Sequence, residues 1–173
     1  MKHLKLTAAS VIITAMISCG GGTEKEVEEK KVEKQVIEEA VEELPQEKEL
    51  VEVTVIAKGE SMSEIAFEPA SMSIPANSKV KLTLNNQSSA EGMLHNFVLV
   101  ELGTGQEIAT AGIKAGSENN FVPNDDRVIA YTVVSKMGET VTIEFDAPAK
   151  GSYHYICTYP GHYPKMIGRL NVE

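Results

Sequence analysis

The chain has 173 residues, 42% of them hydrophobic in type, with a formal net charge of −9 and a pI of about 5.0. This length suits one ordinary domain with accessory segments, and the composition supplies enough apolar residues for a sizeable core. A chain this acidic offers no basic surface to a nucleic-acid backbone, which argues against nucleic-acid binding.

Residues 1–18 have the layout of a secretory signal peptide, with a basic start, an apolar run and the small Ser18 directly before Cys19. The five residues ending at Gly20, Met-Ile-Ser-Cys-Gly, resemble a bacterial lipobox, whose cysteine receives a lipid after cleavage in front of it. We therefore expect a lipid on Cys19 to anchor the protein to a membrane, with the protein on the extracytoplasmic side. The alternatives are an ordinary signal peptide with an incidental cysteine and an uncleaved anchor, but the apolar run is shorter than the ~20 residues of a spanning helix.

Residues 19–50 form a second segment, which begins at the lipidation candidate and continues as a run of Glu, Lys and Val. The apolar residues between Val36 and Leu44 are spaced as one helical stripe that ends before Pro45. Nothing in this segment can bury a core or coordinate a metal tightly, so we interpret it as a charged, partly helical tether. A short coiled-coil seam is the minor alternative.

From residue 51 onward, short apolar or alternating runs are separated by turn residues, which is typical of an all-β sandwich. The predicted strands are residues 51–56, 79–84, 96–100, 127–134, 140–145, 152–157 and 168–172. The stretch 103–124 differs, because residues 107–115 are apolar-periodic and are followed by several Asn and a Pro. It fits either a short helix or an irregular flap between strands.

The clearest chemical signal is the segment from Cys157 to Met166, which reads Cys-Thr-Tyr-Pro-Gly-His-Tyr-Pro-Lys-Met. A thiolate, the imidazole of His162 and a thioether thus follow one another on a loop after a predicted strand. Soft sulfur and imidazole ligands select copper, and two histidines, one cysteine and a weak axial methionine form blue-copper electron-transfer sites. Such a site requires a second histidine.

His95 is the best candidate for this second imidazole. It stands at the start of the strand 96–100, whereas His3 lies in the predicted signal peptide and His154 lies on the strand that leads to Cys157. Side chains alternate across a strand, so His154 points away from the face that Cys157 occupies. Each residue alone is more often core filling or a hydrogen-bonded histidine, but their joint occurrence at this spacing favours a metal site.

Three blocks of sequence, in order, resemble the azurin and auracyanin branch of the cupredoxins. They are residues 93–99 (Met-Leu-His-Asn-Phe-Val-Leu), residues 126–132, and residues 157–168 with their Cys-Thr-Tyr-Pro-Gly-His loop and Met-x-Gly end. The resemblance covers residues 51–173. It implies an all-β Greek-key sandwich with a short helical or irregular flap insertion and one type 1 copper per chain.

The resemblance also implies a role for each matched residue. The copper ligands would be His95, Cys157, His162 and Met166. The backbone carbonyl of Leu94 would take the place of azurin's weak axial contact on the side opposite the methionine. Asn96 and Thr158 would form hydrogen bonds that hold the ligands rigid. An apolar docking face would consist of Met62, Met93, Tyr159, Pro160, Gly161, Tyr163 and Pro164. Simple core filling is the alternative role of the two methionines.

The disulfide of azurins is missing, because Cys157 is the only cysteine after Cys19.

The implied function is electron transfer between extracytoplasmic partners, such as c-type cytochromes or membrane respiratory or photosynthetic complexes, through a partly exposed edge of His162. An enzyme of the multicopper type is disfavoured, because the chain has one His-Cys-His-Met set and no further histidine cluster. The alternative is a periplasmic copper-binding or delivery protein, which would favour exposed, exchangeable Met and His clusters. A metal-free structural lipoprotein is a third possibility, against which the presence of all four ligands argues.

Overall fold

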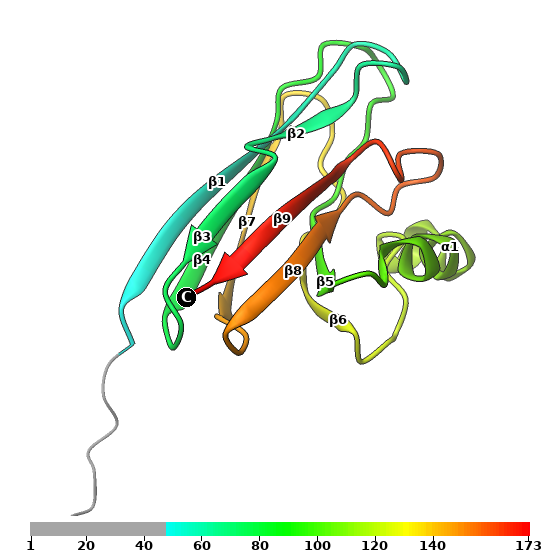
Figure 1. Ribbon diagram of the computed structural model, residues 1–173. Helices are drawn as coiled ribbons and strands as arrows, with labels where there is room; N and C mark the ends of the chain where they lie inside the picture. The colour runs from blue at the N-terminus through cyan, green and yellow to red at the C-terminus, as the bar shows by residue number, and fades with distance from the viewer. Residues whose placement is uncertain (1–47) are drawn as a thin grey trace, which may run out of the picture. The chain divides into compact units, whose positions relative to one another are not determined.

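The computed structural model describes residues 48–173, and these fold into two β-sheets that share one core (Figure 1). The first sheet has the order β2-β1-β4-β7 and consists of β1 (Leu50–Lys58), β2 (Ala66–Glu68), β4 (Lys79–Asn86) and β7 (Thr140–Asp146). The second has the order β3-β9-β8-β5-β6 and consists of β3 (Ser71–Ile74), β5 (Val98–Glu101), β6 (Val128–Tyr131), β8 (Gly151–Ile156) and β9 (Ile167–Val172). The expected all-β sandwich is confirmed. The predicted signal peptide, Cys19 and nearly all of the tether lie outside the described residues.

Alternation along the strands places the core between the two sheets. In β4 the side chains of Val80, Leu82 and Leu84 are buried, and the two between them are half-buried. β1 pairs with β4 in parallel and β7 pairs with it antiparallel, so β4 is a central strand with neighbours on both sides. Strand β4 therefore contributes one continuous apolar face to the core.

An aromatic group fills the core at Tyr155 in β8. Its ring stacks on Phe97 with a centroid distance of 5.4 Å and lies 5.6 Å from the ring of Phe67, and its hydroxyl donates to the carbonyl of Pro69. Opposite Tyr155 in the β8–β9 register is Gly168, which has no side chain to displace the ring. The ring occupies the space that a side chain at Gly168 would fill, so it can lie across the neighbouring strand β9.

Residues 103–124 combine both predicted alternatives. Helix α1 (Gly105–Ala115) is followed by the 3₁₀ turn η1 (Ser117–Asn119) and an irregular return to β6. Ile108 and Ala109 of the helix pack with Val98, Val100 and Ile156 on the outer face of the second sheet. Figure 1 shows α1 beside β8 and β5, and this layer fixes the flap over one face of the sandwich.

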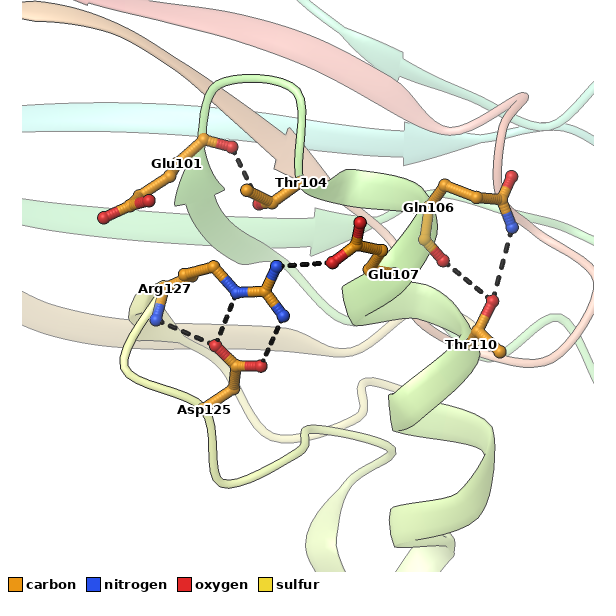
Figure 2. Close-up of polar contacts among 7 residues, drawn as sticks. All are labelled: Glu101, Thr104, Gln106, Glu107, Thr110, Asp125 and Arg127. Atoms are coloured by element: carbon orange, nitrogen blue, oxygen red, sulfur yellow. Dashed lines mark hydrogen bonds and ion pairs between the residues drawn. The ribbon is translucent and has the colours of Figure 1, made fainter.

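Arg127 ties this flap to the sheet (Figure 2). Its guanidinium donates to both carboxylate oxygens of Asp125, at 2.8 and 2.7 Å, and to Glu107 in the first turn of α1. The paired guanidinium lowers the pKa of Asp125 to about 2. Because the carboxylate accepts a bidentate pair, the arginine is held in one orientation and joins the helix to the start of β6.

Two strands were missed by sequence reasoning, and one predicted strand is too long. β2 and β3 have only three and four residues, too few for a period of two to be recognised. The strand predicted at 127–134 ends at Tyr131, because the chain then leaves the ladder and Ser135 forms an isolated bridge with His95. Within residues 48–173, no helix has the length and apolar character needed to cross a bilayer.

Candidate metal centre

Three ligand-type side chains from distant parts of the sequence meet in the interior. One donor atom each from His95, Cys157 and His162 lies within 4.8 Å of the others, and all three residues are buried. His95 follows the loop after β4, Cys157 comes directly after β8, and His162 lies in the loop between β8 and β9. The fold therefore gathers one thiol and two imidazoles in a single enclosed place.

His95 has one ring nitrogen engaged and one free. Its Nε2 lies 3.0 Å from the hydroxyl of Ser88, so these two atoms form a hydrogen bond. Its Nδ1 is buried and, among the side-chain nitrogens and oxygens of residues 48–173, is the one buried atom without a hydrogen-bond partner. A buried polar atom without a partner is costly unless a ligand completes it. This observation fits a metal held at Nδ1.

His162 approaches the thiol directly. Its Nδ1 lies 3.5 Å from Cys157 Sγ, and its ring centroid lies 4.8 Å from that of His95 and 4.9 Å from that of Tyr159. Only 1% of His162 is exposed. The partly exposed edge expected from the sequence is therefore wrong, because the neighbouring rings and loop cover the imidazole almost completely.

Met166 is brought to the same place by the loop's backbone. The N–H of Cys157 donates to the carbonyl of Met166 at 3.1 Å, and the N–H of Met166 donates to the carbonyl of His162 at 3.0 Å. Met166 is fully buried in the same apolar cluster as Cys157. Leu94 precedes His95 in the chain and is half-buried, so its backbone adjoins the site. An axial contact by its carbonyl stays a prediction.

Asn96 and Thr158 form a reciprocal pair behind the cluster. Asn96 Oδ1 accepts from the N–H of Thr158 at 2.9 Å, and its Nδ2 donates to Thr158 Oγ1 and to the carbonyl of Asn120, each at 2.8 Å. Helix α1 closes over this pair: a Cβ added at Gly112 would lie 3.2 Å from Thr158 Cβ and 2.2 Å from the carbonyl oxygen of Phe121. The residue after Cys157 is thus fixed by the strand and by the flap.

Burial keeps the three donors uncharged in the metal-free protein. It raises the pKa of the Cys157 thiol to about 12 and lowers the pKa values of both His95 and His162 to about 4, with further lowering at His95 from the nearby His162. At neutral pH the site therefore holds a thiol and two neutral imidazoles. Metal binding must then displace the thiol proton, because the thiolate is the ligand.

These shifts predict how the stability of the metal-free protein depends on pH. The unfolded histidines protonate near pH 6.5, whereas His95 and His162 in the folded state resist protonation down to about pH 4. Between these values the unfolded chain binds more protons, so the free energy of unfolding falls as the pH is lowered. Urea unfolding at pH 7.5, 5.5 and 4.5 should give steadily lower midpoints.

A control separates this effect from that of the half-buried His154, whose pKa is also lowered by burial. His154→Asn should remove a minor part of the slope and keep most of it. The ion pair of Asp125 loses its contribution only below about pH 4, outside this window. Equal midpoints from pH 7.5 to 4.5 would contradict the burial of two neutral imidazoles.

Sequence reasoning missed the polar residues that hold His95. Asn86 ends β4, and its amide donates to the backbone carbonyls of Met93 and Ser135, at 2.9 and 3.1 Å. One signal was present, because Asn86 continues the buried positions 80, 82 and 84 of the same strand. A polar residue at a core position indicates a satisfied internal network. Ser88 and Ser135 carried no such signal.

The predicted docking residues surround the loop with unequal exposure. Met62 is 44% exposed, and its Cε would lie 3.2 Å from a Cβ added at Gly161. Lys165 Nζ donates to the carbonyl of Met62 at 2.7 Å and so joins the two loops. Met93 is half-buried and packs against the core. The other members are either half-buried or exposed: Tyr159, Pro160, Tyr163 and Pro164. Sequence reasoning missed Ile113 on α1, which is 53% exposed and borders the same surface.

Comparison with known proteins agrees with this geometry. The model of the copper-binding proteins of the plastocyanin/azurin family matches residues 51–173. Auracyanin-A of Chloroflexus aurantiacus is 39% identical over 126 residues, which cover 71% of this chain and 75% of that protein. Azurin iso-2 of Methylomonas sp. strain J is 36% identical, covering 69% of this chain and 96% of that protein. The solved structure of auracyanin A, described as a "blue" copper protein, superposes with a TM-score of 0.65 over 72% of this chain and 99% of that chain, at 38% identity.

Proposed function

Because the chain belongs to the plastocyanin/azurin family of copper-binding proteins, we propose that it carries single electrons between redox partners outside the cytoplasm. Azurin- and auracyanin-type cupredoxins are electron-transfer proteins and not enzymes. The proposed copper ligands are His95, Cys157, His162 and Met166, with the carbonyl of Leu94 as a weak axial contact. The observation that carries it is the buried cluster in which Nδ1 of His95 has no protein partner.

Copper, when bound, supplies the one-electron couple between Cu(I) and Cu(II). The chain's contribution is to hold a set of donors that both oxidation states accept. Bonds from the Asn96–Thr158 pair, from the backbone of Met166 and from Ser88 hold the donors from several sides. A site fixed in this way rearranges little when an electron enters or leaves, which favours fast transfer.

Electron exchange takes place across the apolar docking face around the loop of His162. Met62 faces the open side of Gly161, where an added Cβ would lie 3.2 Å from its Cε, and the half-buried Tyr159 and Tyr163 belong to the same loop as Gly161. Since His162 itself is almost closed off, a partner has to lie flat on these residues to come close to the site. A mainly apolar contact of this kind suits transient docking, in which partners must separate after each transfer.

Met62→Lys tests this docking face. A charge placed in the contact should lower the second-order rate of electron exchange with a c-type cytochrome about tenfold, because it must be desolvated on docking. Leu50→Lys is the matched control, since Leu50 is 52% exposed at the opposite end of β1, and its rate should equal that of the unmodified protein. Stopped-flow absorbance measures both. Equal rates for the two variants would place docking elsewhere.

The location and the partners rest on the sequence. The signal-peptide layout and the lipobox-like segment ending at Gly20 support a protein anchored by Cys19 to an extracytoplasmic membrane surface. There its partners would be c-type cytochromes or membrane respiratory or photosynthetic complexes. A copper-delivery role is less well supported, because His95, Cys157 and His162 are at most 1% exposed and offer no open, exchangeable ligands.

A further inference from the structure

Ser88 forms a hydrogen bond with Nε2 of His95, whereas Nδ1 of the same ring has no partner and is free for a metal. Its hydroxyl lies 3.0 Å from Nε2, and only 3% of the residue is exposed. Because both residues are buried, the hydroxyl of Ser88, and not bulk water, satisfies Nε2. Ser88 belongs to the loop between β4 and β5, outside the three blocks of sequence at 93–99, 126–132 and 157–168.

The position of Ser88 is fixed by Asn86. The N–H of Ser88 donates to Asn86 Oδ1 at 3.1 Å, while Asn86 Nδ2 donates to the carbonyls of Met93 and Ser135. Asn86 is fully buried at the end of a central strand. One amide therefore uses its oxygen and its nitrogen to hold both ends of the loop that carries Ser88.

The backbone of His95 is held by the same network. Its N–H donates to the carbonyl of Ser135 at 3.1 Å, and its carbonyl accepts from the N–H and the hydroxyl of Ser135, at 2.7 and 3.0 Å. Asn86 bonds that same Ser135 carbonyl. Backbone and ring of His95 are thus located by groups connected to one another, which leaves the ring little freedom to turn.

The two tautomers of a neutral His95 differ sharply in this setting. A proton on Nδ1 would create a buried N–H donor with no acceptor, which costs the full desolvation penalty of that group. A proton on Nε2 is accepted by the hydroxyl of Ser88. The second arrangement leaves the lone pair of Nδ1 free, which is the state that a metal ligand requires.

We infer that Ser88 is a positioning residue, which fixes His95 as the Nε2–H tautomer and so presents Nδ1 to the copper. The presentation of Nδ1 to copper rests on the proposed function, whereas the tautomer of His95 does not. Accepting the Nε2 proton also makes the imidazole a stronger donor. Because a stronger donor favours Cu(II) over Cu(I), Ser88 lowers the reduction potential of the site.

The tautomer is measured first, by ¹⁵N NMR of the histidine rings in the metal-free protein at pH 7.5. The unmodified protein should show His95 as a single Nε2–H tautomer. Ser88→Ala should shift the tautomer ratio on the order of tenfold toward Nδ1–H, the worth of one buried hydrogen bond. Ser88→Thr, which keeps the hydroxyl, should restore the original ratio. An unchanged ratio in Ser88→Ala would overturn the inference.

Copper binding and the reduction potential are measured next. Ser88→Ala should bind Cu(II) at least about tenfold more weakly and have a higher reduction potential. Ser78→Ala is the matched control: Ser78 is also buried, and its hydroxyl donates to the carbonyl of Pro75 at 2.7 Å. The Ser78→Ala variant should be less stable but keep the His95 tautomer and the reduction potential unchanged, because Ser78 has only a structural role.

The two readouts separate the inference from the proposed function. If Ser88→Ala changes the tautomer and the unmodified protein binds no copper, the proposed function fails and the positioning role of Ser88 stands. If the unmodified protein binds copper and Ser88→Ala leaves tautomer, affinity and potential unchanged, the positioning role fails and the proposed function stands.

Discussion

Cys157→Ser is expected to abolish the intense visible absorption of the copper-loaded protein. The absorption of a blue-copper site depends on the cysteine thiolate, and a serine hydroxyl is neither soft nor deprotonated at neutral pH. Copper affinity should fall by more than the roughly 10–100-fold that follows the loss of a supporting residue. Absorption spectra and a competition titration with a chelator measure the two effects.

The fold should survive this substitution. Serine is close to cysteine in size, and a hydroxyl at the position of Sγ faces Nδ1 of His162, 3.5 Å from the present sulfur, with which it can form a hydrogen bond. Cys19→Ser is the control, because it removes the other cysteine and should keep the full absorption. A Cys157→Ser protein that is still intensely blue would refute the assignment of the thiolate.

Gly168→Ala is expected to destabilise the protein by about 3 kcal/mol, at the upper end of the cost of overfilling a packed core. A Cβ at this position would lie 2.0 Å from Cζ of Tyr155, deep inside contact distance. The ring cannot move aside easily, since it stacks on Phe97, packs near Phe67 and is bound through its hydroxyl to Pro69. Urea unfolding of the metal-free protein measures the loss.

Two variants show whether the collision with Tyr155 is the cause. In a Tyr155→Leu background the ring is gone, so Gly168→Ala should cost less than about half as much, because contacting sites are not additive. Arg169→Ala alters the exposed neighbour in the same strand and should change stability by no more than about 0.5 kcal/mol. A full cost of Gly168→Ala without the ring would show that the collision with Tyr155 is not the cause.

The parts of the site that could be predicted are those encoded locally. The loop from Cys157 to Met166 carries its ligand types in consecutive sequence, and strand alternation alone separates His154 from Cys157. The structure confirms that alternation: Tyr155 and Cys157 lie in the core between the sheets, whereas Ile156 packs beneath α1. Long alternating strands such as β4 and β7 were likewise recognisable from their period.

The parts that could not be predicted depend on contacts between distant segments. The burial of His162 depends in part on the ring of His95, which comes from a distant segment, and no local pattern indicates that contact. The bond from Ser88 to His95 requires the exact path of a loop with no regular structure. Asn86 is intermediate, because its place at a core position of β4 marks it as unusual without naming its partners.

The most direct test of the account is a redox titration of the copper-loaded, purified protein followed by visible absorption. We predict one copper per chain, an intense band near ~600 nm, full bleaching by one reducing equivalent and full recovery on reoxidation, as a His2Cys-Met site requires. A protein that binds copper without colour, or whose colour does not follow a reversible one-electron change, would contradict electron transfer as its function.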